Sequence, residues 1–125
     1  MDEPNDPVIK MAQLFALDGY IIVILSGRND RTFEATKSWL LKYNIPYDKL
    51  IMRPDKFLKK GEKIADGNIA TQDMRFMPDE VLKNNMLDTF LDVNDIFLVV
   101  DDRDKVVKMW RSLGLKTFQV AYGNF

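Results

Sequence analysis

The sequence predicts an α/β fold, a parallel sheet with helices on both faces. Residues 20–25 and 96–100 are continuous apolar runs rich in β-branched side chains, which is typical of strands buried on both faces. Segments with helical spacing of apolar residues alternate with these runs, as expected for a parallel sheet. The chain has 125 residues, 46% of them hydrophobic and 30% charged, which is enough for one domain over 1–125 with a single core.

The expected elements alternate between helix and strand along most of the chain. Turn signals at Lys59-Lys60-Gly61 and Asp66-Gly67-Asn68 mark the longest irregular stretch as an excursion from the core. In chain order we expect a helix ending at Asp18, a strand over 20–25, a helix over 31–43, a short strand over 50–52, the excursion over 55–77, a helix from 78 towards 91, a strand over 96–100, a helix ending at Gly114 and a strand over 117–120.

Local signals set the ends of these helices. Asp6 suits an N-cap, and Pro7 suits the first helical position because its ring fixes a helical φ. Asn44 and Gly114 suit the residues at which helices stop. Large apolar side chains at helical spacing are expected to face the core: Phe15, Phe33, Trp39, Leu40, Phe90, Met109 and Trp110.

Composition excludes several classes of chemistry. The chain has no cysteine and no histidine, which excludes disulfides, Ser-His and Cys-His nucleophile systems and the usual zinc sites. Lys+Arg 18 against Asp+Glu 19 gives a net charge of -1, so we expect no general attraction to nucleic acid. The longest apolar run is too short to span a bilayer and the N-terminus lacks signal character, so we expect a cytoplasmic protein without membrane contact.

Two polar clusters follow the two apolar strands, where open parallel sheets bind ligands. Asp101 and Asp102 repel each other unless a cation lies beside them, and carboxylate oxygens suit Mg²⁺. Ser26, Gly27 and Arg28 offer a hydroxyl, exposed backbone N–H groups and a guanidinium, which suit the oxygens of a phosphoryl group. Each cluster also has a structural interpretation: one aspartate caps the following helix, and Ser-Gly forms a cap and turn.

Two further sets of charged residues also have two interpretations. Asp79 and Lys83 lie four residues apart on an expected helix, where an exposed ion pair would contribute roughly 0.3–0.5 kcal/mol. Spacing alone favours this ion pair. Arg53 follows a strand and is either another phosphate contact or a solvated loop residue, and the sequence leaves both interpretations open.

The order of these motifs resembles that of a known superfamily. A strand ending in Ser-Gly-Arg, a helix with Asp-x-x-x-Lys and a strand ending in Asp-Asp-Arg are similar to the second, third and fourth motifs of the haloacid dehalogenase (HAD) superfamily. More narrowly, the chain resembles the 3′-phosphatase domain of bacteriophage polynucleotide kinase and its relatives in phages and bacteria. The stretches that carry the resemblance are DEPNDPVI (2–9), GYIIVILSGR (19–28), IPYDKLIMRP (45–54), VVDDRDKVVKMWRSLGL (99–115) and QVAYGNF (119–125).

This resemblance implies a phosphatase with a HAD-like Rossmannoid parallel sheet and a Mg²⁺ cofactor. It implies that a terminal phosphate, such as that of a nucleic-acid 3′ end, is removed through an aspartyl-phosphate intermediate. The roles implied for single residues are phosphate binding by Ser26, Gly27, Arg28 and Arg53, neutralisation of the phosphoryl group by Lys83, orientation of that lysine by Asp79, and Mg²⁺ binding by Asp101 and Asp102.

One motif of the superfamily has no match in the sequence. The family begins with a strand followed by Asp-x-Asp-Gly-Thr, whose first aspartate is the nucleophile and whose second is the general acid. Neither Asp2 nor Asp6 follows an apolar strand. The resemblance puts the missing strand between those that end at Leu25 and Val100, and it makes the aspartate pair half of a metal site. We therefore expect exposed strand edges, and either self-association or an upstream segment that completes the sheet.

Two functions of different classes agree with these features. The first is a Mg²⁺-dependent phosphomonoester hydrolase domain of the polynucleotide kinase 3′-phosphatase type, inactive alone because the nucleophile is absent. The second is a non-catalytic HAD-like module that binds phosphate, nucleotide or a protein partner. Kinase activity is not expected, because the sequence contains no P-loop motif GxxxxGK[ST].

Overall fold

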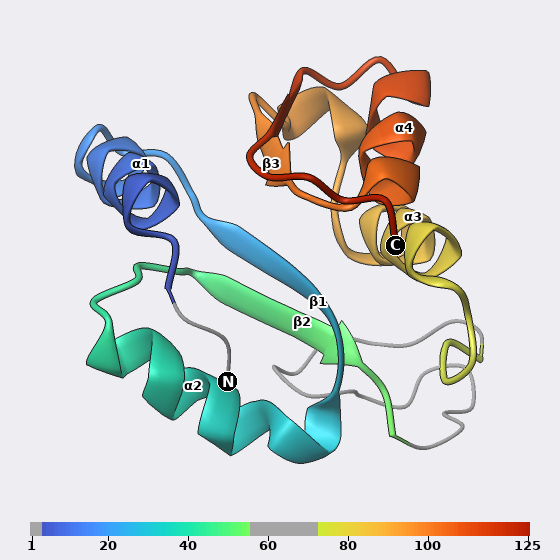
Figure 1. Ribbon diagram of the computed structural model, residues 1–125, viewed down its shortest axis with the longest axis horizontal. Coiled ribbons are helices and arrows are strands. Elements are labelled where there is room, and N and C mark those ends of the chain that lie inside the picture. The colour runs from blue at the N-terminus through green and yellow to red at the C-terminus, as the bar shows by residue number, and fades with distance from the viewer. Residues whose placement is uncertain (1–3, 56–72) are drawn as a thin grey trace.

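The computed structural model describes residues 4–55 and 73–125, and it confirms an α/β fold with parallel strands and helices on both faces (Figure 1). Most of the excursion expected over 55–77 lies outside the described residues. The elements in chain order are α1 (Asp6–Leu17), β1 (Val23–Asn29), the 3-10 helix η1 (Asp30–Thr32), α2 (Phe33–Lys42), β2 (Lys49–Arg53), α3 (Asp79–Phe90), the 3-10 helix η3 (Val93–Asp95), β3 (Val99–Asp101), α4 (Asp104–Ser112) and β4 (Thr117–Gln119).

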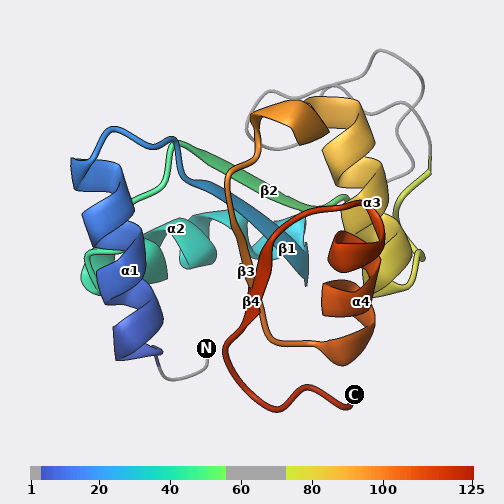
Figure 2. The same cartoon turned by 90° about the horizontal axis from the view of Figure 1, so that it is seen from above.

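The described strands form two parallel pairs. β1 pairs with β2, beginning with Val23 opposite Lys49, and β3 pairs with β4, beginning with Val99 opposite Thr117. Within the described residues β1 and β3 are not paired with each other, so the sheet is interrupted between them (Figure 1 and Figure 2). The interruption lies where the family resemblance implies a missing central strand.

Helices cover both faces of the β1–β2 pair. Successive side chains of a strand point to opposite faces, so neighbouring residues of β2 reach different helices. Ile51 packs with Leu82 and Met86 of α3, whereas Leu50 packs with Leu40 of α2. All five side chains are buried, and each contributes about 1.5–3 kcal/mol through the loss of contact with water.

A third hydrophobic cluster joins α3 and α4 to both strand pairs. Leu87 of α3 packs with Val106 and Trp110 of α4. Partly buried side chains from β1 and β3, the two strands on either side of the interruption, border this cluster: Leu25 from β1 and Val99 from β3. β1 and β3 therefore contribute to one hydrophobic core although they do not form one sheet.

β1 is less buried than its sequence predicts. A doubly covered strand is expected from its continuous apolar run, yet no residue of Val23–Asn29 is fully buried. One edge of β1 carries β2, and among the described residues no strand lies along its other edge. We attribute the partial exposure of β1 to this open edge.

An aromatic cluster connects the segments that precede β1 and β3. Tyr20 precedes β1 and Phe97 precedes β3, and their ring centroids lie 5.1 Å apart. Phe15 of α1 makes an edge contact with Tyr20, again with a centroid distance of 5.1 Å. α1 is thereby attached to both sides of the interruption in the sheet.

Three local predictions are wrong by a few residues. Asn5 caps α1 in place of Asp6, because the Asn5 side chain accepts a hydrogen bond from Val8 N at 3.3 Å. β1 begins after residue 20 and extends beyond residue 25, because its pairing with β2 runs from Val23 to Asn29. The strand expected over 96–100 shortens to β3, because β4 pairs with three of its residues only.

The predicted helix stops are confirmed. Asn44, with a φ of 54°, and Gly114, with a φ of 83°, adopt the left-handed conformation that ends a helix. Leu40 and Trp110 are buried, as their helical spacing predicts. In residues 4–55 and 73–125 no helix is both long enough and apolar enough to cross a membrane.

Candidate active site

The carboxyl ends of β1, β2 and β3 meet beside the first turn of α3. Parallel strands all end at the same edge of a sheet, which gathers the residues that follow them. Ser26–Arg28 lies at the end of β1, Arg53 ends β2, and Asp101 ends β3. Asp79 is the first residue of α3, directly after its N-cap Pro78. These are the positions at which the sequence predicts a site.

Asp79 joins the ends of three strands. Its Oδ1 accepts from Arg53 Nη2 at 3.0 Å, and its Oδ2 accepts from Arg103 Nη1 at 2.9 Å. Its carboxylate also lies directly against Gly27, because a Cβ built on that glycine would be 2.9 Å from Asp79 Cγ and closer still to Oδ1. Only a glycine leaves space for this carboxylate at the end of β1.

Arg53 is almost fully occupied by contacts with its own chain. Its Nε donates to Gly27 O at 2.8 Å, its Nη1 donates to Met77 O at 2.6 Å, and its Nη2 donates to Asp79. The side chain is 16% exposed. Arg53 is therefore not a solvated loop residue. It connects the end of β1 to the segment before α3 and to α3 itself.

Asp73 and Arg75 form a local pair within that segment. Their Nη2 and Oδ2 atoms are 3.1 Å apart, and hydrogen bonds from the side chain and the backbone of Arg75 hold the pKa of Asp73 below its ordinary value of 3.8. The Arg75 guanidinium also lies 5.0 Å from the centre of the Phe76 ring. Since the carbonyl of Arg75 also accepts from Arg53 at 3.3 Å, the segment is fixed at both its side chains and its backbone.

Lys83 pairs with Asp101 and not with Asp79. Its Nζ lies 3.2 Å from Asp101 Oδ2, and the two side chains are 12% and 11% exposed. The surface ion pair between Asp79 and Lys83 that the helical spacing favours is therefore not formed. The Asp101 carboxylate also accepts from Trp110 Nε1, at 3.1 Å to Oδ2, and from Asp102 N, at 2.8 Å to Oδ1.

Neither aspartate of the pair caps the following helix. The N-cap of α4 is Arg103, which makes no side-chain capping bond, so the structural interpretation of Asp101 or Asp102 as a cap is wrong. Asp102 is exposed, and its backbone carbonyl accepts from Gln119 Nε2 at 3.0 Å. One carboxylate is thus fixed beside Lys83, while the other faces solvent next to it.

The Ser26-Gly27-Arg28 segment lies in the last part of β1, where the pairing with β2 is irregular between Ser26 and Asn29. Ser26 Oγ accepts from Arg28 N at 3.1 Å, and Arg28 is exposed. The helical segment after this strand is capped by Asn29, whose Oδ1 accepts from Arg31 N at 2.9 Å, so Ser26 is not its cap. Gly27, the next residue, lies against the Asp79 carboxylate.

The described residues supply only part of a metal site. Carboxylate oxygens are the ligands that Mg²⁺ prefers, so the donor type of Asp101 and Asp102 fits this ion. No group of three His, Cys, Asp or Glu side chains that could hold a metal ion occurs among residues 4–55 and 73–125. Both oxygens of Asp101 already accept hydrogen bonds. The pair therefore needs further ligands, from water, substrate or another segment, to hold a divalent ion.

A family comparison agrees with this arrangement. The family model described as "Polynucleotide kinase PNKP phosphatase domain" matches residues 1–125, the whole chain. The chain belongs to this family. The resemblance drawn from its motifs is thereby confirmed, together with its place among HAD-type phosphatases, which are generally metal-dependent.

Two solved structures are similar to this phosphatase domain over its full length. One is the structure of a Pnkp1/Rnl/Hen1 complex, with 30% identity and a TM-score of 0.78. The other is the structure of the Pnkp1/Rnl/Hen1 RNA repair complex, with 30% identity and a TM-score of 0.76. Both matches cover 100% of this chain, but only 38% and 35% of those chains. The chain therefore spans little more than a third of the length of these relatives.

Two residues of the phosphatase domain have contacts that the sequence analysis does not predict. Trp110 is assigned to the core from its helical spacing, and it is 3% exposed, yet its indole also donates to Asp101. Arg103 lies in the Asp-Asp-Arg motif, and the structure adds its ion pair with Asp79. Spacing along one helix or loop carries no information on either contact, because each partner lies on another element.

Proposed function

We propose that this chain is the larger part of a Mg²⁺-dependent phosphatase domain that hydrolyses phosphomonoesters at nucleic-acid 3′ ends. The observation that carries the proposal is a pair of contacts at the carboxyl ends of the strands: Lys83 pairs with Asp101 at the end of β3, and Asp79 lies against Gly27 near the end of β1. Cations and backbone N–H groups beside partly buried carboxylates suit a phosphoryl group and its metal ion. Membership of a polynucleotide kinase phosphatase family supports the substrate class.

In the proposed site, Ser26, Gly27 and Arg28 bind the phosphoryl oxygens. The Ser26 hydroxyl and the backbone amides donate hydrogen bonds, and Arg28 adds a charged donor. Arg53 acts indirectly, because its donors hold Gly27 O and Asp79 in position. A positively charged side chain at a transferring phosphoryl group stabilises the negative charge that builds up on its oxygens.

Lys83 and the aspartate pair act on the other side of the phosphoryl group. Lys83 lies beside Asp101 with 12% exposure, so its charge is only partly screened by water and can neutralise the phosphoryl oxygens. Asp79 positions this region through the two arginines that it pairs with, rather than by contact with Lys83. Asp101 and Asp102 would contribute ligands to Mg²⁺, which when bound supplies charge stabilisation at the phosphoryl group.

The proposed nucleophile comes from a strand inserted between β1 and β3. Each of these strands has a parallel neighbour along one edge within the described residues, and the additional strand would pair with the other edge of each. Leu25 and Val99 already share a hydrophobic cluster on the two sides of this position. An apolar strand followed by Asp-x-Asp-Gly-Thr would bring two further carboxylates to the edge where Asp101 and Lys83 lie.

A complementation experiment tests this proposal. We expect the 125-residue chain alone to release no phosphate from a 3′-phosphorylated oligonucleotide in the presence of Mg²⁺. Fusing an apolar strand with Asp-x-Asp-Gly-Thr before residue 1 is expected to produce phosphate release, which Asp101→Ala abolishes. Asp88→Ala, an exposed change on α3, is the matched control and should leave the activity intact. A folded fusion protein without activity would contradict the proposal.

The second candidate function is that of a non-catalytic assembly module. It is favoured by one observation: the interruption between β1 and β3 offers strand edges with which another chain could pair. This function predicts a mass in solution above the monomer value of 14.6 kDa, or a stable complex with a partner. Light scattering that reports a monomer at all concentrations would exclude self-association through these edges.

A further inference from the structure

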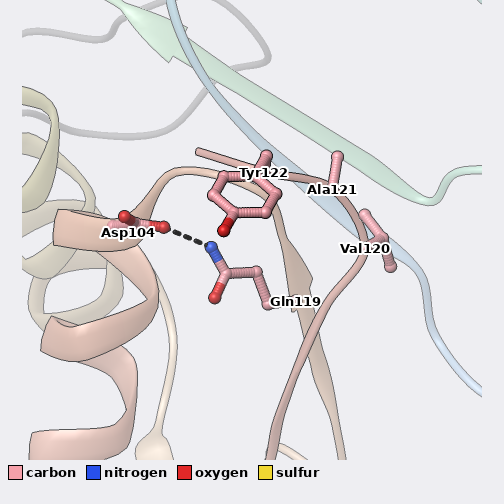
Figure 3. Close-up of a pocket in the computed structure, with 5 residues that line it drawn as sticks. All are labelled: Asp104, Gln119, Val120, Ala121 and Tyr122. Carbon is pink, nitrogen blue, oxygen red and sulfur yellow. Dashed lines mark hydrogen bonds between the residues drawn. The ribbon is translucent and has the colours of Figure 1, made fainter. Parts of the chain in front are cut away.

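The residues after β4 form a cavity beside the candidate site. Its volume is about 460 Å³, within the range of roughly 300–1,000 Å³ that is usual for small-molecule sites. The cavity lies at the carboxyl end of β4 and the start of α4 (Figure 3). Its lining residues are Asp104, Gln119, Val120, Ala121 and Tyr122.

Two residues that line this cavity, Gln119 and Val120, are hydrogen-bonded to the loop that carries the aspartate pair. Gln119 Nε2 donates to Asp102 O at 3.0 Å and to Asp104 Oδ1 at 2.6 Å, and the second of these bonds is drawn in Figure 3. Asp104 N donates to Gly123 O at 2.8 Å. A Cβ on Gly123 would lie 2.6 Å from the carbonyl carbon of Asp102, so the backbone after Tyr122 packs directly on this loop.

Tyr122 presents its ring to solvent on this fixed backbone. Its side chain is 98% exposed. The backbone on both sides of it is fixed by hydrogen bonds: Val120 N donates to Asp101 O at 3.1 Å, and Gly123 O accepts from Asp104 N at 2.8 Å. An exposed aromatic ring on an ordered backbone is a surface on which a nucleobase can stack, and such stacking tolerates every base.

The polar groups of the cavity favour a neutral heterocycle over a second phosphate. The Asp104 carboxylate lines it, and a like charge disfavours an additional anion there. Both hydrogen-bonded contacts of the Gln119 amide use its nitrogen, and among the described residues its carbonyl oxygen has no partner. That oxygen can accept a hydrogen bond from an exocyclic amine of a base.

We propose that this cavity binds the nucleobase of the nucleotide that carries the substrate phosphate. Tyr122 stacks on the base, and Gln119 accepts a hydrogen bond from it. The proposal rests on the proposed phosphatase function, because it places the base next to the Asp101–Arg103 loop while the phosphate lies at the ends of β1 and β3. It explains how a chain with a net charge of -1 would distinguish a nucleotide from a simple sugar phosphate.

The test measures binding of three probes to the 125-residue chain by NMR titration in the presence of Mg²⁺. The probes are adenosine 3′-monophosphate, ribose 5-phosphate, which has no base, and adenosine, which has no phosphate. We expect Tyr122→Ala to weaken binding of adenosine 3′-monophosphate about 5- to 150-fold and to leave ribose 5-phosphate unchanged. Tyr122→Phe should retain the wild-type affinity, because the ring is kept. Phe118→Ala, which removes an exposed ring from the opposite face of β4, is the matched control.

The outcomes separate the base site from the phosphate site. Equal affinities for adenosine 3′-monophosphate and ribose 5-phosphate, unchanged by Tyr122→Ala, would overturn the base site and leave the proposed phosphatase function intact. Adenosine binding that Tyr122→Ala removes, without binding of either phosphate probe, would support the base site and overturn the phosphate site. The loss of binding for all probes in Phe118→Ala as well as in Tyr122→Ala would overturn the assignment to Tyr122.

Discussion

Gly27→Ala adds one methyl group at a position where we expect it to disturb the candidate site. Its Cβ would lie 2.9 Å from Cγ and 3.0 Å from Oδ2 of Asp79, and closer still to Oδ1. The carboxylate cannot simply move aside, because Arg53 holds one of its oxygens at 3.0 Å and Arg103 holds the other at 2.9 Å. Accommodating the methyl group therefore requires the ion pairs of Asp79 to lengthen or break.

The expected cost is about 2–4 kcal/mol in the free energy of unfolding. Inserting a methyl group into a packed position costs about 1–3 kcal/mol, and weakening a hydrogen bond to a charged group adds up to about 1.5–3 kcal/mol. Alanine returns about 0.4–1 kcal/mol, because it restricts the unfolded chain more than glycine does. With roughly 4 °C per kcal/mol for a chain of this size, the melting temperature should fall by about 8–16 °C.

A double-mutant cycle followed by circular dichroism measures this effect. Thermal and urea unfolding are compared for the wild type, Gly27→Ala, Asp79→Ala and the double variant. Removing the Asp79 carboxylate removes the atoms that meet the new methyl group, so the double variant should be more stable than the two single effects predict, by at least about 1 kcal/mol. Gly114→Ala is the control, because its left-handed backbone is strained by a side chain but nothing lies within 4 Å of its Cβ.

Additive effects of Gly27→Ala and Asp79→Ala would refute this reasoning. They would mean that alanine at position 27 does not meet the Asp79 carboxylate. The same conclusion would follow if Asp79→Ala improved the Gly114→Ala variant as much as the Gly27→Ala variant, since Asp79 has no contact with position 114.

Two further predictions concern polar contacts near the site. Trp110→Phe keeps an aromatic ring in the core but removes the donor to Asp101, so thermal unfolding should show a loss of about 1–2 kcal/mol. Trp39→Phe, which removes no side-chain hydrogen bond to another described residue, should cost less. Equal losses would contradict a role for the indole N–H of Trp110. The pKa of Asp73 is lowered by hydrogen bonds from Arg75, so the pair stabilises the fold above about pH 4 and this contribution is lost as the pH falls through the lowered pKa. Acid unfolding of Asp73→Asn should therefore differ from the wild type near neutral pH and converge with it in strong acid, and a difference that persists in strong acid would argue against the linkage.

Several features of the site follow from sequence patterns because they depend on neighbours in the chain. The apolar runs before Ser26 and Asp101 predict parallel strands, and Ser26 and Asp101 lie near the carboxyl ends of β1 and β3, as expected. Asn44 and Gly114 end helices as predicted, since a helix stop depends on the φ angle of one residue. The phosphatase family can also be identified from short stretches in a fixed order along the chain.

The α/β class and the family can be predicted from the sequence, because the class is encoded in the periodicity of apolar residues and the family in short motifs. The partners of the charged side chains depend on the tertiary structure. Lys83 pairs with Asp101 across two elements, although its helical spacing favours Asp79. Asp79 instead holds two arginines, and the sheet remains interrupted between β1 and β3. Such contacts depend on how distant elements pack, and no spacing within one element specifies them.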